Sequence, residues 1–264
     1  MFNNNYCEIL FFFKIRENLE NKIFWLFLNR PDKKNAFDLA VANELYQILE
    51  EEVEKDLENI RVLICTTSLD DFFTVGLDIN WILTLDDEEA REMTRRLQVV
   101  FKKLEDISIP VIAAIKGLNL TAGFELMLCA DIIIAAENAR FGQVETKYSL
   151  TPAAGATQRL IRLVGPLKAR EIIYTARTLD AQEALQIGLI NEVVPLADFE
   201  DRVKQLAQMI VNNSGKAIAL CKSLIQKGIY ENEKGFQAEG DAFYDLFSSG
   251  KPKEKFKAFL ERKK

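Results

Sequence analysis

The stretch from Pro110 to Asp131, PVIAAIKGLNLTAGFELMLCAD, most strongly constrains the fold of this 264-residue chain. It opens with five apolar residues, Val111 to Ile115, a pattern typical of a strand buried on both faces of a parallel sheet. A turn at Lys116-Gly117 follows, and the apolar run from Phe124 to Ala130 predicts a helix. A buried strand and a buried helix must therefore lie close together in the core.

A single carboxylate, Glu125, lies inside this apolar helix. Burial disfavours the charged form of a carboxyl group and raises its pKa toward values useful for proton transfer. The N–H groups around Ala122 and Gly123 open the helix, so they have no partner within it. A second carboxylate, Glu145, follows in FGQVE, at the end of another short strand pattern. Together these groups predict acid–base chemistry on a substrate that develops negative charge on oxygen.

Each of these signals also has a plainer interpretation. A charge after a strand, such as Glu145, is commonly a surface residue, and Gly76 and Gly123 can serve turns alone. The exposed lysines, Lys33 and Lys34 among them, are commonly a solvated face. Taken singly, these residues indicate a site without naming a reaction.

Composition excludes several classes of chemistry. The sequence has no histidine, which rules out histidine triads and histidine-ligated metals, and we predict no metal site. The net charge of −6 argues against nucleic acid as a partner. The four cysteines form no C-x-x-C pair, which suits a reducing compartment. The apolar patch from Ile9 to Phe13 is too short for a membrane span, so we expect a soluble cytoplasmic protein.

Strand-like and helix-like segments alternate along the chain, which predicts an α/β fold. We expect a hairpin over residues 8–28, a loop through DDFFTVGLDINWI, and a wholly helical remainder after about Leu196. Further helices are expected over residues 39–56, 86–107, 158–164, 168–176 and 181–187, and further strands over 61–66, 132–136 and 189–194. The C-terminal part carries an aromatic stripe: Phe236, Phe243, Tyr244, Phe247, Phe256 and Phe259.

Five segments in a fixed order identify a family. They are LNRPDKKNAF, FFTVGLDI, IKGLNLTAGFELMLCADIIIAAENARFGQVE, TPAAGATQRL and TLDAQEALQIGLINEVVP. The set resembles the crotonase superfamily, and within it the enoyl-CoA hydratases, over essentially the whole chain. The resemblance implies an α/β, crotonase-like spiral of ββα units over residues 1–195, which carries the CoA and catalytic site. It also implies a helical C-terminal region, residues 196–264, for trimerisation or as a lid, and assembly as a homotrimer or a dimer of trimers.

The resemblance assigns roles to individual residues. Two backbone N–H groups, of Leu77 after Gly76 and of Ala122 beside Gly123, match the oxyanion hole that binds the thioester carbonyl. Glu125 and Glu145 match the two catalytic glutamates. The positions that match CoA and substrate contacts are Lys34, Ala36, Phe37, Gly76, Asp78, Ile79 and Gly123. The substrate is an acyl-CoA thioester, and since coenzyme A belongs to the substrate, no separate cofactor is implied.

Three positions depart from the family pattern. Thr121-Ala122-Gly123 replaces a run of three glycines before the catalytic helix, Asn80 replaces a lysine that often follows the first loop, and Ala153 replaces a glycine near the catalytic water. We expect a hydratase, because both glutamates are present. The alternatives are a Δ3-Δ2-enoyl-CoA isomerase that uses Glu145 alone, a specialised acyl-CoA hydratase, or a non-catalytic CoA- or RNA-binding protein on the same scaffold.

Overall fold

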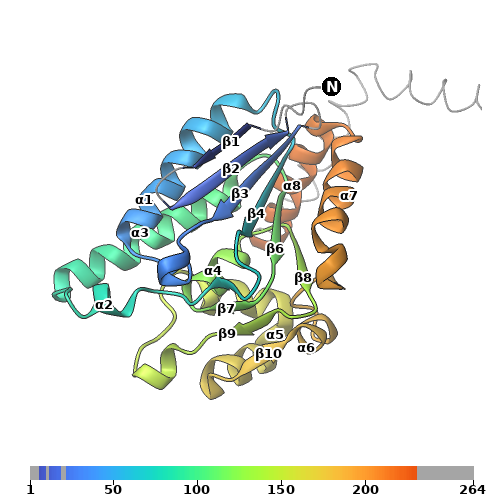
Figure 1. The fold of residues 1–264 in the computed structure, drawn as a ribbon. Helices are drawn as coiled ribbons and strands as arrows, with labels where there is room; N and C mark the ends of the chain where they lie inside the picture. Colours follow the sequence, from blue (N-terminus) through green and yellow to red (C-terminus); the bar gives the residue numbers. More distant parts are fainter. Residues whose placement is uncertain (1–5, 10–11, 19–21, 231–264) are drawn as a thin grey trace, which may run out of the picture. The chain divides into compact units, whose positions relative to one another are not determined.

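The computed structural model describes residues 6–9, 12–18 and 22–230 (Figure 1). The chain divides between Asn212 and Asn213 into two compact units. The first unit contains two sheets. The larger has the strand order β1 (Tyr6–Ile9), β2 (Phe13–Asn18), β3 (Ile23–Leu28), β4 (Val62–Thr67), β6 (Val111–Ile115), β8 (Ile132–Ala136) and β11 (Glu192–Val194). The smaller has the order β10 (Thr178–Asp180), β9 (Arg140–Gly142), β7 (Leu118–Leu120) and β5 (Phe72–Thr74).

Helices connect these strands. In chain order, the first unit has η1 (Pro31–Lys33), α1 (Leu39–Ile48), the π-helix η2 (Leu49–Val53), η3 (Glu54–Asp56), α2 (Ile79–Ile82), α3 (Asp87–Asp106), α4 (Ala122–Met127), η4 (Glu145–Tyr148), α5 (Ala156–Thr175), α6 (Ala181–Gln186), η5 (Leu196–Asp198) and α7 (Phe199–Val211). In the second unit the structure describes α8 (Gly215–Tyr230).

Successive segments of the first unit repeat one arrangement. The chain adds a strand to the large sheet, then a strand to the small sheet, and then a helix: β4, β5 and α2–α3, then β6, β7 and α4, then β8, β9 and η4–α5. Because each repeat advances by one strand in both sheets, the units wind as a spiral. The predicted spiral of ββα units is confirmed.

The centre of the large sheet is buried on both faces, because β3, β6 and β8 are apolar throughout and β4 is apolar up to Cys65, as parallel central strands require. Alternate residues face opposite sides: Leu63 and Cys65 of β4 belong to the core on one face, and Val62 and Ile64 belong to the core on the other. Helices α1 and α3 contribute to the first core, and α7 contributes to the second. Figure 1 shows these helices on opposite sides of the sheet.

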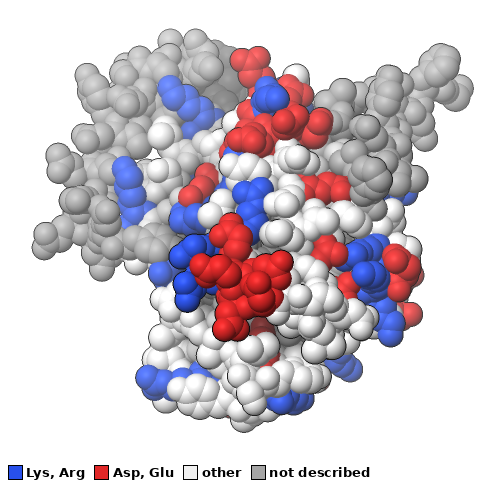
Figure 2. Space-filling model, turned by 90° about the vertical axis from the view of Figure 1, so that its left-hand side faces the viewer, with Lys and Arg blue, Asp and Glu red and all other residues white. Residues whose placement is uncertain are grey.

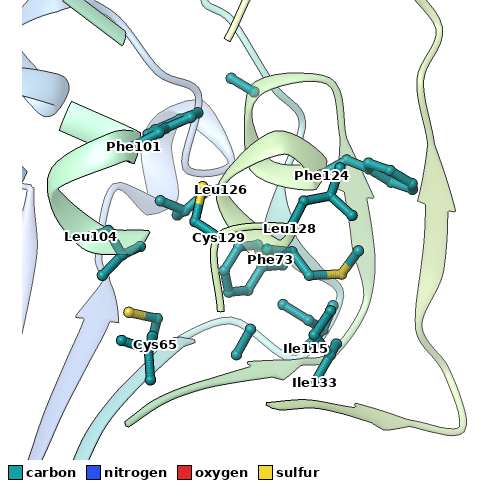
Figure 3. Close-up of a cluster of buried hydrophobic side chains, with 14 of the residues drawn as sticks. Cys65, Phe73, Phe101, Leu104, Ile115, Phe124, Leu126, Leu128, Cys129 and Ile133 are labelled. Carbon is teal, nitrogen blue, oxygen red and sulfur yellow. The ribbon is translucent and has the colours of Figure 1, made fainter. Parts of the chain in front are cut away.

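Helix α4 is buried along its whole length, because every residue from Ala122 to Met127 is apolar or enclosed. Figure 3 shows Phe124 and Leu126 of α4 among Phe73, Phe101 and other apolar side chains. Cys65 and Cys129 also lie in this cluster as free, buried thiols.

Several predicted elements match closely. Strand β8 has the predicted bounds, and α3 begins at a capping box in which Asp86 and Glu89 each accept a backbone N–H of the other. The predicted helix over residues 39–56 continues from α1 through η2 and η3. A break at Gly165 (φ 74°) divides α5 where two separate helices were predicted. The helix predicted over residues 181–187 is α6, and Asp180 caps it, since its side chain accepts the Glu183 N–H.

Other predictions were wrong at short elements. The expected loop through residues 70–82 contains strand β5 and helix α2, and β7 was not predicted at all. Three-residue strands are too short for a period-2 pattern, and here pairing with neighbours in the small sheet forms them. The expected hairpin is wrong in one respect, because its first run divides between β1 and β2 before β2 pairs with β3. Glu145 does not end a strand but begins η4.

Two parts of the sequence-based description stay predictions. The aromatic stripe from Phe236 to Phe259 lies outside the described residues. The domain boundary after residue 195 also stays a prediction. Within the described ranges, no helix has both the length and the apolar character needed to cross a membrane.

Candidate active site

The candidate site forms where three neighbouring strands of the small sheet end. Strands β5, β7 and β9 are parallel neighbours, so their carboxyl ends meet at one edge of the sheet. Leu77, Ala122 and Glu145 each follow one of these strands within three residues. The repeated ββα unit therefore brings together groups that are far apart in the sequence.

The first predicted donor, the Leu77 N–H, lies in a loop held by Phe37. Phe37 and Leu77 form an isolated parallel bridge, in which the Phe37 N–H donates to the Gly76 carbonyl at 2.7 Å and the Asp78 N–H donates to the Phe37 carbonyl at 2.7 Å. These bonds use the groups on either side of Leu77, so its own N–H faces away from Phe37. Among the described residues it has no backbone acceptor and is available to a ligand.

The second predicted donor, the Ala122 N–H, belongs to the first residue of α4 and has no acceptor within the helix. The preceding residue, Thr121, fixes its direction. The Thr121 N–H donates to the Gly142 carbonyl at 3.0 Å, and the Thr121 carbonyl accepts the Glu125 N–H at 2.9 Å. Thr121 itself has φ 46° and ψ −114°, a conformation that L-residues with branched side chains rarely adopt. The departure from three glycines thus places strain at Thr121.

The two donor turns touch each other where each has a glycine. A Cβ atom on Gly76, which has φ 94°, would lie 1.7 Å from Thr121 Oγ1. A Cβ atom on Gly123 would lie 1.9 Å from Thr74 Cγ2. Only glycine permits this approach, so Gly76 and Gly123 do more than serve turns.

Glu125 lies in the interior, 3% exposed, and binds the loop before α5. Its Oε1 accepts the Ala154 N–H at 2.8 Å and the Ala156 N–H at 3.0 Å. Desolvation raises the pKa of Glu125, and the two N–H donors and the charge of Arg159 oppose that rise. Ala153 supplies neither donor, so its methyl group does not displace a partner of this carboxylate.

Glu145 is also enclosed, at 9% exposed, but its environment differs. Its Oε2 is buried and accepts no hydrogen bond from the described residues. Desolvation raises the pKa of Glu145 to about 7, and the negative charge of Glu125 adds to this rise. Glu125 thus has N–H donors that favour its charged form, whereas Glu145 lacks an equivalent set.

The predicted CoA-contacting residues fall into two groups. Lys34 and Ile79 are exposed, and Ile79 has 61% of its surface accessible. Ala36, Phe37, Gly76 and Gly123 are buried, so a contact with the Phe37 position would come from its backbone. Asp78 is buried as well: its carboxylate accepts from Lys33 Nζ at 2.6 Å, and this contact lowers its pKa.

The surface beside this loop is strongly charged. Figure 2, seen from the side on which α2 lies in Figure 1, shows a patch of acidic side chains with basic side chains next to it. Asp86, Asp87, Glu88 and Glu89 at the start of α3 are exposed, as are Lys33 and Lys34. Asn80 is exposed near the start of α2 and adds no charge.

The sequence did not reveal two residues that hold the site together. Asn35, with φ 58°, donates from Nδ2 to Thr67 Oγ1 at 2.8 Å and to the Phe73 carbonyl at 2.9 Å. Asparagine tolerates this left-handed conformation. Pro31, Asp32 and Asn35 are all common in turns, so their proximity in the sequence could have indicated a turn here. Thr74 hydrogen-bonds Gly76, and nothing in the sequence distinguishes it from other threonines.

The arrangement suits one kind of chemistry. Two N–H groups without backbone acceptors can bind an oxygen on which negative charge develops, and one such donor is commonly worth about 3 kcal/mol in a transition state. Two enclosed carboxyl groups with raised pKa values can exchange protons beside that oxygen. The geometry therefore supports proton transfer next to a carbonyl.

Comparisons with known proteins agree with this reading. A family model described as Enoyl-CoA hydratase/isomerase matches residues 18–264. A crotonyl-CoA hydratase of Syntrophomonas wolfei is 38% identical over 93% of this chain and 94% of its own length. A short-chain-enoyl-CoA hydratase of Clostridium acetobutylicum is 36% identical over the same shares. The crystal structure of an enoyl-CoA hydratase from Bacillus anthracis superposes with a TM-score of 0.87, at 33% identity, and covers 98% of this chain and 97% of that one.

Proposed function

Because the chain belongs to the enoyl-CoA hydratase/isomerase family, we propose that it is an enoyl-CoA hydratase. The reaction is the reversible syn addition of water to a trans-2-enoyl-CoA, which gives a 3-hydroxyacyl-CoA. The observation that carries this proposal is the pair of enclosed carboxyl groups, Glu125 and Glu145, beside two free backbone donors. Addition of water needs a base for the water and an acid for the carbon, and the pair supplies both.

The donors stabilise the intermediate. The Leu77 and Ala122 N–H groups bind the thioester oxygen, and water addition at C3 places negative charge on that oxygen as an enolate. Charge that develops against fixed donors needs no reorganisation of the protein, which lowers the barrier.

The carboxyl groups move the protons. Glu125 takes a proton from the water as the water attacks C3, and Glu145 gives its proton to C2. The N–H donors of Ala154 and Ala156 keep Glu125 charged and oriented as the base. Glu145 has a pKa of about 7 and so retains a proton near neutral pH. The pair begins and ends the reaction with one proton.

Coenzyme A binds along the first loops. Lys34 and Ile79 are exposed and contact the CoA moiety, while Ala36, Phe37 and Asp78 shape the loop that holds it. Gly76 and Gly123 let the two turns that carry the donors pack against each other and so shape the thioester site. Two similar proteins are named for crotonyl-CoA and short-chain enoyl-CoA, which supports a short-chain substrate.

The wider context is part of the proposal. The catalytic core comprises residues 1–195, and residues 196–264 form the helical region that takes part in trimerisation or covers the site. The protein assembles as a homotrimer or a dimer of trimers in the cytoplasm. It acts in fatty-acid β-oxidation or a related pathway. It binds neither nucleic acid nor membrane. The mechanism needs no resident metal or redox cofactor.

Loss of the conjugated-thioester absorbance of crotonyl-CoA tests the proposal, with the Glu145→Gln variant measured alongside. We expect rapid loss with the wild-type protein and a decrease of at least 100-fold with the variant, because general acid–base catalysis contributes about 10²–10⁴-fold. No loss with crotonyl-CoA or a longer trans-2-enoyl-CoA would contradict the proposal. Conversion of a 3-enoyl-CoA to a 2-enoyl-CoA would then identify an isomerase.

A further inference from the structure

Thr74, the last residue of β5, contacts both turns that carry the proposed oxyanion donors. We propose that Thr74 is a positioning residue that sets the separation between the Leu77 N–H and the Ala122 N–H. The inference rests on the proposed function, because it concerns the same oxyanion hole. Thr74 has none of its surface exposed, so it acts through these turns and not by touching the substrate.

The hydroxyl group of Thr74 holds the first turn. Its Oγ1 donates to the Asn35 carbonyl at 2.6 Å and accepts the Gly76 N–H at 3.0 Å. The Gly76 carbonyl in turn accepts the Phe37 N–H at 2.7 Å. The Gly76–Leu77 peptide is planar, so its carbonyl and the Leu77 N–H point in opposite directions. Bonds at both ends of Gly76 therefore fix the direction of the Leu77 donor.

The methyl group of Thr74 supports the second turn. Its Cγ2 lies 1.9 Å from the place that a Cβ atom on Gly123 would take. Asn119, which pairs with Thr74 on β7, has its Oδ1 2.4 Å from the same place. Thr74 and Asn119 thus form the surface on which the first turn of α4 rests. Ala122 immediately precedes Gly123, so this contact sets the position of the second donor.

The local strand geometry brings Thr74 to this place. The pairing of β5 with β7 shifts register between Phe72 and Thr74, which are opposed by the adjacent residues Leu118 and Asn119. Such an irregularity redirects the side chains that follow it and is common beside active sites. Phe73 and Thr74 are both fully buried, as the shift allows. Catalysis by fixed donors is sensitive to displacements of a fraction of an ångström, so the spacing matters for rate.

The role of the hydroxyl group is tested with a matched pair of variants. Thr74→Val keeps the shape but removes both hydrogen bonds, whereas Thr74→Ser keeps the hydroxyl group. With crotonyl-CoA we expect T74V to lower kcat about tenfold or more and to change KM by less than about threefold. Removal of a whole donor costs about 10²–10³-fold in kcat, and T74V displaces a donor without removing it. T74S keeps the hydroxyl group but lacks the methyl group, so we expect it to lower kcat less than T74V does. Equal kcat for T74V and wild type would overturn the proposal.

A spectroscopic measurement separates positioning from general loss of structure. Butyryl-CoA labelled with ¹³C at its carbonyl can be bound to each protein, and the carbonyl stretching frequency read by infrared difference spectroscopy. Hydrogen bonds to the oxygen lower that frequency. We expect wild type to lower it more than T74V does, and T74S, which keeps the hydroxyl group, also to lower it more than T74V does. An undiminished shift in a folded T74V would overturn the proposal.

The role of the methyl group is tested at Gly123. Gly123→Ala alone forces its new Cβ atom against Thr74 Cγ2, whereas Gly123→Ala combined with T74S meets no Cγ2 there. We expect the double variant to have a kcat at least about threefold above that of G123A alone, because the overpacking against Thr74 is relieved while the contact with Asn119 Oδ1 is the same in both variants. A kcat in the double variant no higher than in G123A would overturn the contact. These two variants also decide the question if T74V does not fold.

Failure of the proposed function would look different from failure of this inference. A wild-type protein that hydrates no enoyl-CoA contradicts the hydratase assignment. Butyryl-CoA, which has no double bond to hydrate, still reports the donors by its carbonyl frequency. The comparison of wild type with T74V then decides the role of Thr74 alone.

Discussion

Gly76 and Thr121 fit against each other so closely that a Cβ atom on Gly76 would lie 1.7 Å from Thr121 Oγ1. Both residues have positive φ angles, 94° and 46°. The two turns that carry the proposed donors therefore pack together through two residues that both have positive φ angles. The position of each donor depends on the other turn.

Substitution of Gly76 by alanine should destabilise the protein by about 3 kcal/mol, the sum of backbone strain and overpacking. Adding Thr121→Gly removes the hydroxyl group that the new methyl group meets and should restore about 1–2 kcal/mol. Urea unfolding of wild type, both single variants and the double variant gives the coupling energy between the sites.

Thr121→Gly alone is the control in that cycle. It relieves strain but increases the freedom of the unfolded chain, so we expect its stability to stay within about 1 kcal/mol of wild type. If the two single effects add to within about 0.5 kcal/mol in the double variant, the contact is not the source of the cost.

Glu125→Gln and Glu125→Ala should separate the chemical role of Glu125 from its structural role. Glutamine retains an oxygen that can accept the Ala154 and Ala156 N–H groups, but it cannot take a proton from water. We expect E125Q to lose at least 100-fold in kcat with little change in unfolding free energy. E125A leaves two buried N–H groups without partners and should lose a further 2–4 kcal/mol or so of stability. Equal stability of the two variants would contradict the hydrogen-bonding role.

The rate of hydration should depend on pH through the shared proton. In the proposed mechanism the carboxyl pair is active with one proton, carried by Glu145, whose pKa is raised to about 7. We expect kcat/KM for crotonyl-CoA to fall about tenfold per pH unit above that value. The reaction consumes no net proton, so kcat/KM for dehydration of 3-hydroxybutyryl-CoA must fall in parallel. A kcat/KM that is flat from pH 6 to pH 9 would contradict the assignment of Glu145.

Stability should also depend on pH at Glu145. Its folded pKa of about 7 lies above its ordinary value of 4.5. The folded state thus binds more protons than the unfolded state between these values, and stability falls as pH rises through this window. We expect Glu145→Gln, which cannot ionise, to match wild type near pH 5 and to exceed it by about 2 kcal/mol at pH 8. Urea unfolding at both pH values measures the difference, and equal stability at pH 8 would refute the raised pKa.

The sequence predicted the long elements well, because buried strands and helices have runs or periodic spacings of apolar residues. The five apolar residues from Val111 to Ile115 and those from Ile132 to Ala136 form strands with the predicted bounds. The acidic start of α3 marks its capping box. The enclosed position of Glu125 also followed from the apolar residues around it.

The sequence predicted less where the structure depends on contacts between distant segments. Strands β5, β7 and β9 have three residues each and exist because they pair with one another. The contact of Thr74 with Gly123 joins two separate ββα units, and no local pattern reports it. The strain at Thr121 is likewise invisible, because its backbone angles follow from the position of Gly142 on the neighbouring strand.

The proposed site residues follow three neighbouring strands. Leu77 follows β5, Ala122 and Glu125 follow β7, and Glu145 follows β9. Replacement of Glu145, three residues after β9, would leave the proposed donors at Leu77 and Ala122 intact. A single such change could therefore redirect what happens to an enolate without altering how it is formed. Because the proposed donors and Glu145 depend on the ends of different strands, a substitution at one strand end can change one of them and leave the other in place.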